Sequence, residues 1–194
     1  MNSGTNELIT VVSGLPRSGT SMLMQMLDAA SYPCLTDGVR KADADNPRGY
    51  FEYEKVKRLR RDWAWMPEAK GKAVKIIAQL IPFLPPQFSY QVVFMERNIS
   101  EVLASQREML QRQGKSGGNL SDAQLHSIFE RQVLEVKQML AQRNIPTLDV
   151  AYSDALQRPV EIAENIREFI SKNLDVCAMA AVIDPNLHRQ QCEQ

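Results

Sequence analysis

The chain has 194 residues, a length that fits one domain, or one domain with a modest appendage. Its 44% hydrophobic and 24% charged residues are typical of a globular protein that buries a core without disulfides or metal ions. The 23 basic and 23 acidic residues cancel, so no overall field attracts nucleic acid or an anionic membrane, and neither is an expected partner.

The cysteines and the N-terminal residues predict a cytoplasmic protein. Cys34, Cys177 and Cys192 are scattered without metal-ligand spacing, so we expect reduced thiols and no metal site. The residues before position 8 are polar and acidic. The apolar stretch that follows, residues 8–12, is too short for a signal peptide or a membrane span.

The N-terminal part of the chain predicts a strand, a glycine loop, a helix and a long loop. Residues 8–12 form a β-branched run that is typical of a buried parallel strand. Residues 13–21 contain glycines and lead into residues 22–30, which have helical composition. A strand, a glycine loop and a helix in this order open a P-loop fold. Gly, Pro, Asp and Asn are scattered through residues 33–49, which we expect to form a loop.

The middle of the chain predicts a basic helix and two further strands. We expect the helix over residues 53–65, while residues 73–77 and 90–95 have the apolar composition of core strands. A long helix between these strands is disfavoured by three prolines, Pro82, Pro85 and Pro86.

The C-terminal half predicts helices separated by one more strand. From Ile99 the apolar residues recur with a helical period, which residues 113–120 interrupt as a flexible break. Ser121 begins a capping box for a long second helix. Residues 146–150 predict a strand, and Pro159 suits the first position of the last major helix.

Strands that alternate with helices indicate the α/β class. We expect a P-loop-type, doubly wound parallel sheet flanked by helices. The expected organisation is a single domain over residues 1–194, with a C-terminal tail at residues 184–194.

The glycine loop has the spacing of a phosphate cradle. Gly14 and Gly19 are separated by four residues, and glycines at these positions let backbone amides turn inward on an anion at a helix N-terminus. A nucleoside-triphosphate loop carries Lys where this chain has Thr20, so a standard ATPase or GTPase is disfavoured. Arg17 supplies the cation instead, and its guanidinium fork suits a tetrahedral oxyanion. The alternative is a glycine turn that merely joins strand to helix.

The residues Pro16-Arg-Ser-Gly-Thr-Ser21 resemble the phosphosulfate loop of the sulfotransferases that use 3′-phosphoadenosine 5′-phosphosulfate (PAPS). The chain is similar to a short, bacterial-type member of this family. The resemblance implies that the 5′-phosphosulfate is contacted by five residues, Arg17, Ser18, Gly19, Thr20 and Ser21. It implies that Arg17 also stabilises charge on the bridging oxygen during sulfuryl transfer.

A second motif matches the family's 3′-phosphate site. In the family an Arg at a strand end is followed eight residues later by a Ser, and Arg97 and Ser105 match this pattern. Ser105 falls outside the apolar face of its predicted helix, so its hydroxyl can face a ligand. The resemblance implies that both residues hold the 3′-phosphate of PAPS. The alternative is a surface Arg and a solvated Ser.

The chain departs from the family at the catalytic base. Many cytosolic members carry a histidine two residues after the position of Lys75, where this chain has Ile77. Residues 45–52 resemble the Asn-Pro-x-Gly-x-x-Glu stretch of bacterial and glycan-sulfating relatives, which implies Glu52 as the base. Lys75 would help to polarise the leaving phosphate. The alternatives are that Glu52 charges the start of the next helix and that Lys75 merely flanks its strand.

The C-terminal glycine-rich segment of larger family members is also absent, and Arg189 is expected to approach the 3′-phosphate in its place. The expected function is therefore sulfuryl transfer from PAPS, without a metal, to a hydroxyl or amine of a small-molecule or glycan acceptor. Two alternatives stay open: a small kinase-like P-loop protein, and a catalytically silent nucleotide-binding module. A homo-oligomer also stays open, because a partner subunit could supply missing acceptor-binding elements.

Overall fold

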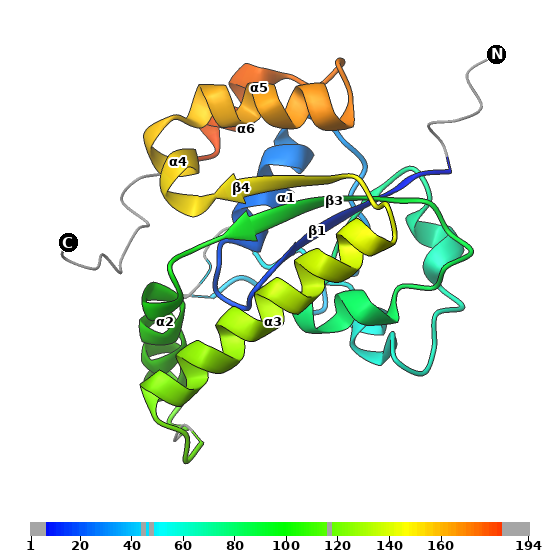
Figure 1. Cartoon of the computed structure of the whole chain (residues 1–194). Helices are drawn as coiled ribbons and strands as arrows, with labels where there is room; N and C mark the ends of the chain where they lie inside the picture. The colour runs from blue at the N-terminus through cyan, green and yellow to red at the C-terminus, as the bar shows by residue number, and fades with distance from the viewer. Residues whose placement is uncertain (1–6, 44–45, 47–48, 116–117, 184–194) are drawn as a thin grey trace.

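The computed structural model describes residues 7–43, 46, 49–115 and 118–183. Its centre is an all-parallel sheet of four strands in the spatial order β2-β1-β3-β4 (Figure 1). The strands are β1 (Ile9–Gly14), β2 (Ala73–Lys75), β3 (Tyr90–Glu96) and β4 (Thr147–Ala151). The expected parallel α/β sheet is confirmed.

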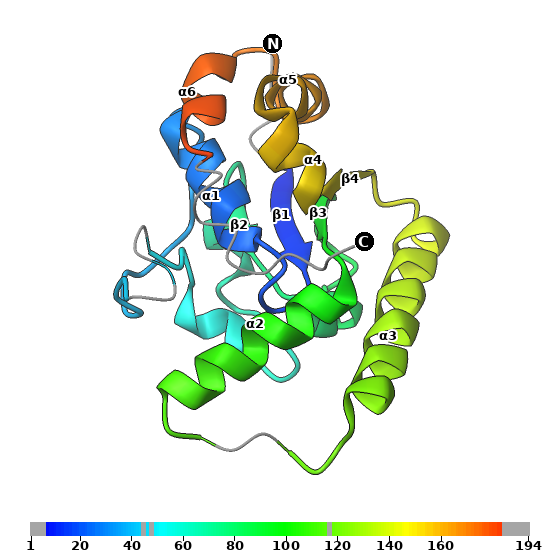
Figure 2. The same cartoon turned by 90° about the vertical axis from the view of Figure 1, so that its left-hand side faces the viewer.

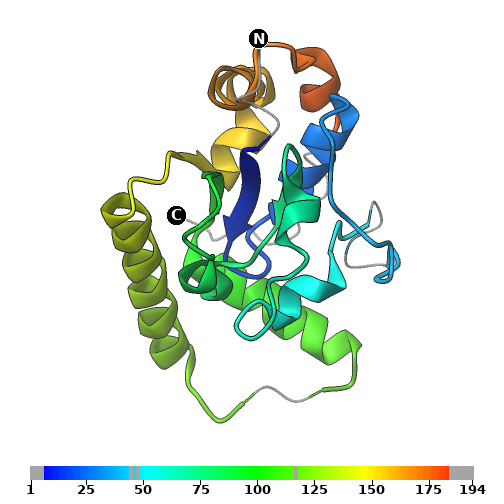
Figure 3. The same cartoon turned by 90° about the vertical axis from the view of Figure 1, so that its right-hand side faces the viewer.

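Helices cover both faces of this sheet (Figures 1, 2 and 3). The α-helices are α1 (Thr20–Ala29), α2 (Ile99–Arg112), α3 (Asp122–Gln142), α4 (Tyr152–Gln157), α5 (Pro159–Ile170) and α6 (Val176–Ala181). Three 3₁₀-helices complete the elements: η1 (Glu54–Arg58), η2 (Met66–Ala69) and η3 (Ala78–Phe83). No helix in the described part of the chain combines the length and apolar character needed to cross a membrane.

Alternate residues of β1 supply two separate cores. Val11 points into a cluster formed with α3 and the three 3₁₀-helices, and Val12 points into a cluster formed with α1, α5 and α6. Both side chains have no exposed surface, and every residue of β1 is buried. A strand that is buried on both faces is typical of a parallel sheet between two helical layers. The described residues therefore form a single α/β domain.

The predicted helix over residues 53–65 is wrong. The structure has the short 3₁₀-helix η1 there, followed by turns and η2. The buried residues in and next to η1 are Tyr53, Val56 and Leu59, which recur every three positions. A period of three matches the 3₁₀-helix rather than the α-helix, whose period is 3.6 residues.

Other boundaries differ less. The strand predicted over residues 73–77 keeps only Ala73–Lys75 in the sheet, and the following chain turns into η3. The short helix α6 was not predicted from the sequence. The capping box at Ser121 is confirmed, because its side chain accepts from the Gln124 amide while the Gln124 side chain accepts from the Ser121 amide.

Candidate functional site

A cleft of about 560 Å³ opens at the edge of the sheet where β1, β2 and β3 end. Ligands of α/β proteins bind outside the carboxyl ends of parallel strands. The walls are the loop between β1 and α1, the first turn of α1, the end of β2, the inner face of α2, and the residues Arg40, Asn46, Tyr50 and Glu52. Eight sequence-predicted site residues line this cleft: Arg17, Gly19, Thr20, Ser21, Glu52, Lys75, Arg97 and Ser105.

The β1–α1 loop is packed so closely that two of its positions require glycine. A Cβ on Gly14 would lie 2.5 Å from Ser18 Oγ and 2.6 Å from a carbonyl oxygen of β3. A Cβ on Gly19 would lie 2.7 Å from the Tyr152 ring, and the φ of Gly19 is +109°, in the left-handed region. The loop therefore lies directly against β3 and α4.

The loop presents backbone amides to the cleft. Among the hydrogen bonds of the described residues, none has the amide of Gly19, Thr20 or Ser21 as its donor. These amides belong to the first turn of α1, where a helix leaves its N–H groups without intrahelical acceptors and carries a partial positive charge. The N-terminus of α1 therefore offers donors to an anion.

Ser18 lies beneath the loop rather than on the cleft wall. Its amide donates to the Leu15 carbonyl oxygen at 3.1 Å, and its residue is 1% exposed. The buried Oγ of Ser18 has no hydrogen-bond partner among the described residues. Of the expected loop contacts, the structure thus brings Arg17 and residues 19–21 to the cleft and leaves Ser18 behind them.

The two sequence motifs interlock at Arg17. Arg17 Nε donates to Ser105 Oγ at 3.0 Å, and Arg97 Nη1 donates to the Arg17 carbonyl oxygen at 3.2 Å. The Arg97 side chain is 8% exposed; its Nε donates to Glu101 Oε2 at 2.9 Å, and its guanidinium lies 4.5 Å from the Tyr152 ring centroid. These contacts orient both arginines at the same end of the cleft.

Lys75 joins β2 to the opposite wall. Its Nζ donates to the Tyr50 carbonyl oxygen and, at 3.3 Å, to Ser21 Oγ, and it lies 3.5 Å from Glu52 Oε1. Burial lowers the pKa of Lys75 to about 8, against the opposing effect of the nearby Glu52 carboxylate. Lys75 therefore carries its proton at neutral pH and loses it as the pH rises through about 8.

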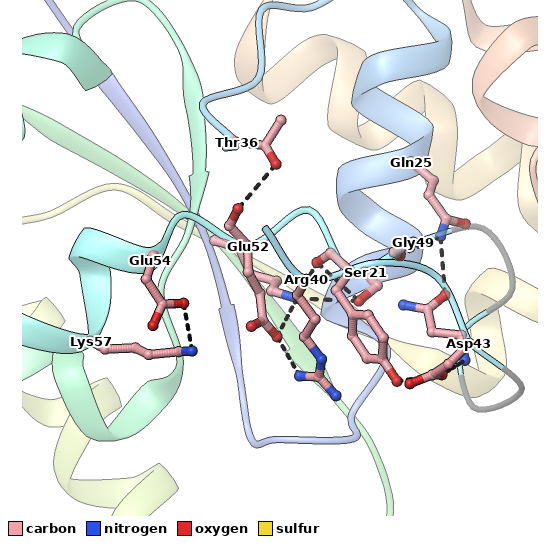
Figure 4. A network of polar contacts seen from close by, with 12 residues as sticks. Ser21, Gln25, Thr36, Arg40, Asp43, Gly49, Glu52, Glu54 and Lys57 are labelled. Atoms are coloured by element: carbon pink, nitrogen blue, oxygen red, sulfur yellow. Dashed lines mark hydrogen bonds and ion pairs between the residues drawn. The ribbon is translucent and has the colours of Figure 1, made fainter. Parts of the chain in front are cut away.

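Glu52 lies between two cations. Arg40 Nη1 donates to Glu52 Oε1 at 2.7 Å, the same oxygen that Lys75 approaches, and Figure 4 shows the labelled Arg40 and Glu52. The Glu52 carbonyl oxygen accepts from Thr36 Oγ1 at 3.0 Å, which ties the backbone at Glu52 to the loop that follows α1. The carboxylate is thus held in the cleft, and Arg40 and Lys75 neutralise it.

Arg40, Tyr50 and Tyr152 are cleft residues that the sequence did not reveal. Arg40 belongs to a segment that the sequence predicts only as a loop, and no local pattern gives the path of such a segment. Arg189, which is expected near the 3′-phosphate, lies outside the described residues.

The cleft concentrates positive charge in a chain whose net charge is zero. In the described part of the chain, its lining has two carboxylates, Glu52 and Glu108, against five cations, Arg17, Arg40, Lys75, Arg97 and Arg112. Converging cations in a cleft raise the local concentration of anions. No group of three or more His, Cys, Asp or Glu residues in the described segments is arranged to hold a metal ion.

A scan against protein-family models and a search of the curated proteins found no match for this chain. The fold and the cleft together define an α/β protein with a positively charged cleft at the carboxyl edge of its sheet.

Proposed function

We propose that this protein is a sulfotransferase that moves a sulfuryl group from PAPS to a hydroxyl or amine acceptor. The observation that carries the proposal is the hydrogen bond between Arg17 and Ser105, which are 88 positions apart in the sequence. Each residue belongs to one of the two motifs that resemble the PAPS site. Two independent motifs that meet in one positively charged cleft support a ligand with two separate anionic ends.

The 5′-phosphosulfate is assigned to the N-terminus of α1. The amides of residues 19–21 and the Arg17 side chain supply the donors there. The 3′-phosphate is assigned to Arg97 and Ser105, next to the same loop. Because Arg97 already contacts Glu101, the 3′-phosphate takes the place of that carboxylate when it binds.

The proposed reaction is an in-line sulfuryl transfer. A bond forms between the acceptor oxygen or nitrogen and sulfur, while the bond from sulfur to the bridging oxygen breaks and adenosine 3′,5′-bisphosphate leaves. Charge develops on the bridging oxygen, and Arg17 and protonated Lys75 stabilise it. The acceptor proton goes to Glu52, the carboxylate that lies beside Lys75.

A nucleotide-binding protein without transfer activity is the second candidate. The observation that favours it is the contact of Glu52 Oε1 with Arg40 at 2.7 Å, since a carboxylate must exchange such a partner before it accepts a proton. A kinase-like protein would prefer ATP with magnesium. The sulfotransferase, the silent nucleotide-binding protein and the kinase-like protein therefore differ in the ligand that they prefer and in whether they turn PAPS over.

Titration with adenosine 3′,5′-bisphosphate, its 5′-monophosphate and magnesium ATP tests the site. We expect the bisphosphate to bind most tightly, and Arg97→Ala to weaken its binding about 10- to 100-fold while changing the 5′-monophosphate little. Arg107→Ala is the matched control, because Arg107 is an exposed arginine of α2 that pairs with Asp122 and does not line the cleft. An equal loss for both nucleotides contradicts the 3′-phosphate assignment.

Release of the bisphosphate from PAPS, with an acceptor or with water, tests the chemistry. We expect Glu52→Gln to keep the affinity for the bisphosphate and to lower turnover by about 10²–10⁴-fold, because an amide is not a useful base at neutral pH. Full activity of this variant with an acceptor would show that the base is elsewhere. Tight bisphosphate binding without any turnover in the wild type would favour the binding module.

A further inference from the structure

Arg40 is a cation of the cleft that stands apart from both phosphate motifs. It belongs to the loop between α1 and η1, whereas Arg17 and Arg97 follow the ends of β1 and β3. Its guanidinium carbon lies 3.4 Å above the centroid of the Tyr50 ring. Its Nη1 donates to Glu52 Oε1. An aromatic ring thus orients one face of the guanidinium inside the cleft, beside the proposed base.

The ion pair of Arg40 with Glu52 is of the kind that exchanges readily. The two side chains are 38% and 21% exposed, and pairs with this exposure contribute little to stability because water and salt compete with them. Arg40 uses one nitrogen in this contact, although its fork is shaped to hold both oxygens of a carboxylate.

The cleft also has more cationic side chains than the assigned contacts to the nucleotide require. Arg17 and Arg97 are assigned to the two anionic ends of PAPS, and Lys75 lies beside the loop. Arg40 adds a cation on the wall that it forms with Tyr50 and Glu52, where none of the phosphate-motif residues lies. The group that Arg40 already holds in the structure is a carboxylate.

We propose that Arg40, stacked on Tyr50, is the acceptor-recognition residue, and that the acceptor carries a carboxylate. This inference rests on the proposed sulfotransferase function and names its substrate class. The acceptor carboxylate takes the place of Glu52 at Arg40. Glu52 then keeps Lys75 as its neighbour and is released to receive the proton of the acceptor hydroxyl. Acceptor binding and activation of the base are thereby coupled through one guanidinium.

Matched probe pairs test the proposal in protein saturated with adenosine 3′,5′-bisphosphate. Each pair has a carboxylate member and a hydroxymethyl member: methyl glucuronoside with methyl glucoside, and 4-hydroxyphenylacetate with 4-hydroxyphenylethanol. By calorimetric or ligand-detected magnetic resonance titration, we expect the carboxylate member of at least one pair to bind about tenfold more tightly. Arg40→Gln should abolish this preference and leave bisphosphate affinity within about twofold.

The Glu52→Gln variant tests whether the acceptor carboxylate replaces Glu52 at Arg40 or is only attracted by the charge of Arg40. Because this change removes the carboxylate that competes for Arg40, we expect it to tighten binding of the carboxylate probe about three- to tenfold, although it lowers turnover. Arg107→Gln, which breaks a comparable surface pair with Asp122 outside the cleft, should change neither probe. Circular dichroism and melting curves establish that each variant is folded.

The outcomes distinguish the two proposals. If adenosine 3′,5′-bisphosphate does not bind, the proposed function falls, and the acceptor assignment falls with it. If the bisphosphate binds but the probes of each pair bind equally, or the preference survives in Arg40→Gln, the acceptor assignment alone is overturned. If the preference holds but Glu52→Gln binds the carboxylate probe no more tightly than the wild type, the exchange between Glu52 and the acceptor is overturned.

Discussion

Lys75 illustrates how one buried charge organises this cleft. A lysine in the interior normally costs stability unless polar groups surround it, and here Nζ has the Tyr50 carbonyl oxygen, the Ser21 hydroxyl and the Glu52 carboxylate around it. These groups come from two separate parts of the chain, the start of α1 and the segment that carries Tyr50 and Glu52. The ammonium therefore joins the end of β2 to the start of α1 and to the wall that carries Glu52.

The lowered pKa of Lys75 predicts a pH dependence of stability. The native pKa of about 8 lies below the ordinary lysine pKa of 10.5, so between these values the unfolded chain binds a proton that the native state has lost. The free energy of unfolding should therefore rise with pH across this interval, by about 1–3 kcal/mol relative to Lys75→Met. Below pH 8 and above pH 10.5 the difference between the two proteins should be constant. Urea unfolding of both proteins from pH 7 to 11 measures this difference in the free energy of unfolding. A difference that does not change with pH would contradict the lowered pKa of Lys75.

At the scale of elements, the helices differ in how their N-termini are satisfied. Asn98, Ser121 and Asp175 cap α2, α3 and α6 with their side chains. The helix α1 begins after Gly19 without a side-chain cap. A side-chain cap and an external anion accept from the same amides at a helix N-terminus. A capped helix therefore has fewer amides available to bind an anion. The helices α4 and α5 also begin without a side-chain cap, and the uncapped first turn of α1 lines the cleft.

The capping box of α3 predicts a measurable loss on substitution. Ser121→Ala removes the acceptor for the Gln124 amide and should lower the free energy of unfolding by about 1 kcal/mol. The matched control is Ser127→Ala, an exposed position within the same helix, which should change stability by less than about 0.5 kcal/mol. Denaturant titrations of both variants provide the comparison. Equal effects would mean that the cap contributes nothing beyond helix propensity.

At the scale of the molecule, one thin sheet supports two cores. Val74, Val92 and Phe94 point to the face covered by α3 and the 3₁₀-helices, while Ala73 and Val93 point to the face covered by α1, α5 and α6. Neither helical layer can keep its apolar side chains buried if the sheet separates, because each layer packs on the strands. The two cores therefore depend on each other.

This arrangement predicts a single unfolding transition. Trp65 lies in the core beside α3, and Trp63 packs against Phe88 on the same side, so tryptophan fluorescence reports that layer. Circular dichroism at helical wavelengths reports all the helices, including α1 and α5 on the other layer. We expect the two signals to give the same midpoint and slope in urea. A fluorescence transition at lower urea than the circular dichroism transition would show that the layers unfold separately.

The sequence predicted best those features that neighbouring residues specify. The strand before Gly14, the helix after Gly19 and the capping box at Ser121 depend on local composition, on glycine and on hydrogen bonds within four residues. The segment after Tyr53 failed because its basic composition suits an α-helix, while burial at every third residue draws it into a 3₁₀-helix against the core. Propensity gave way there to tertiary packing.

By itself, the sequence determined the α/β class and singled out the residues of the two motifs that resemble a PAPS site, because each motif occupies a few adjacent or regularly spaced positions. Only the tertiary structure decided that these motifs share one cleft, since parallel strands bring distant loops to the same edge of the sheet. It also decided that Ser18 turns away and that Arg40 meets Glu52. The path of a long loop depends on the surfaces against which it packs, and those surfaces exist only in the folded chain.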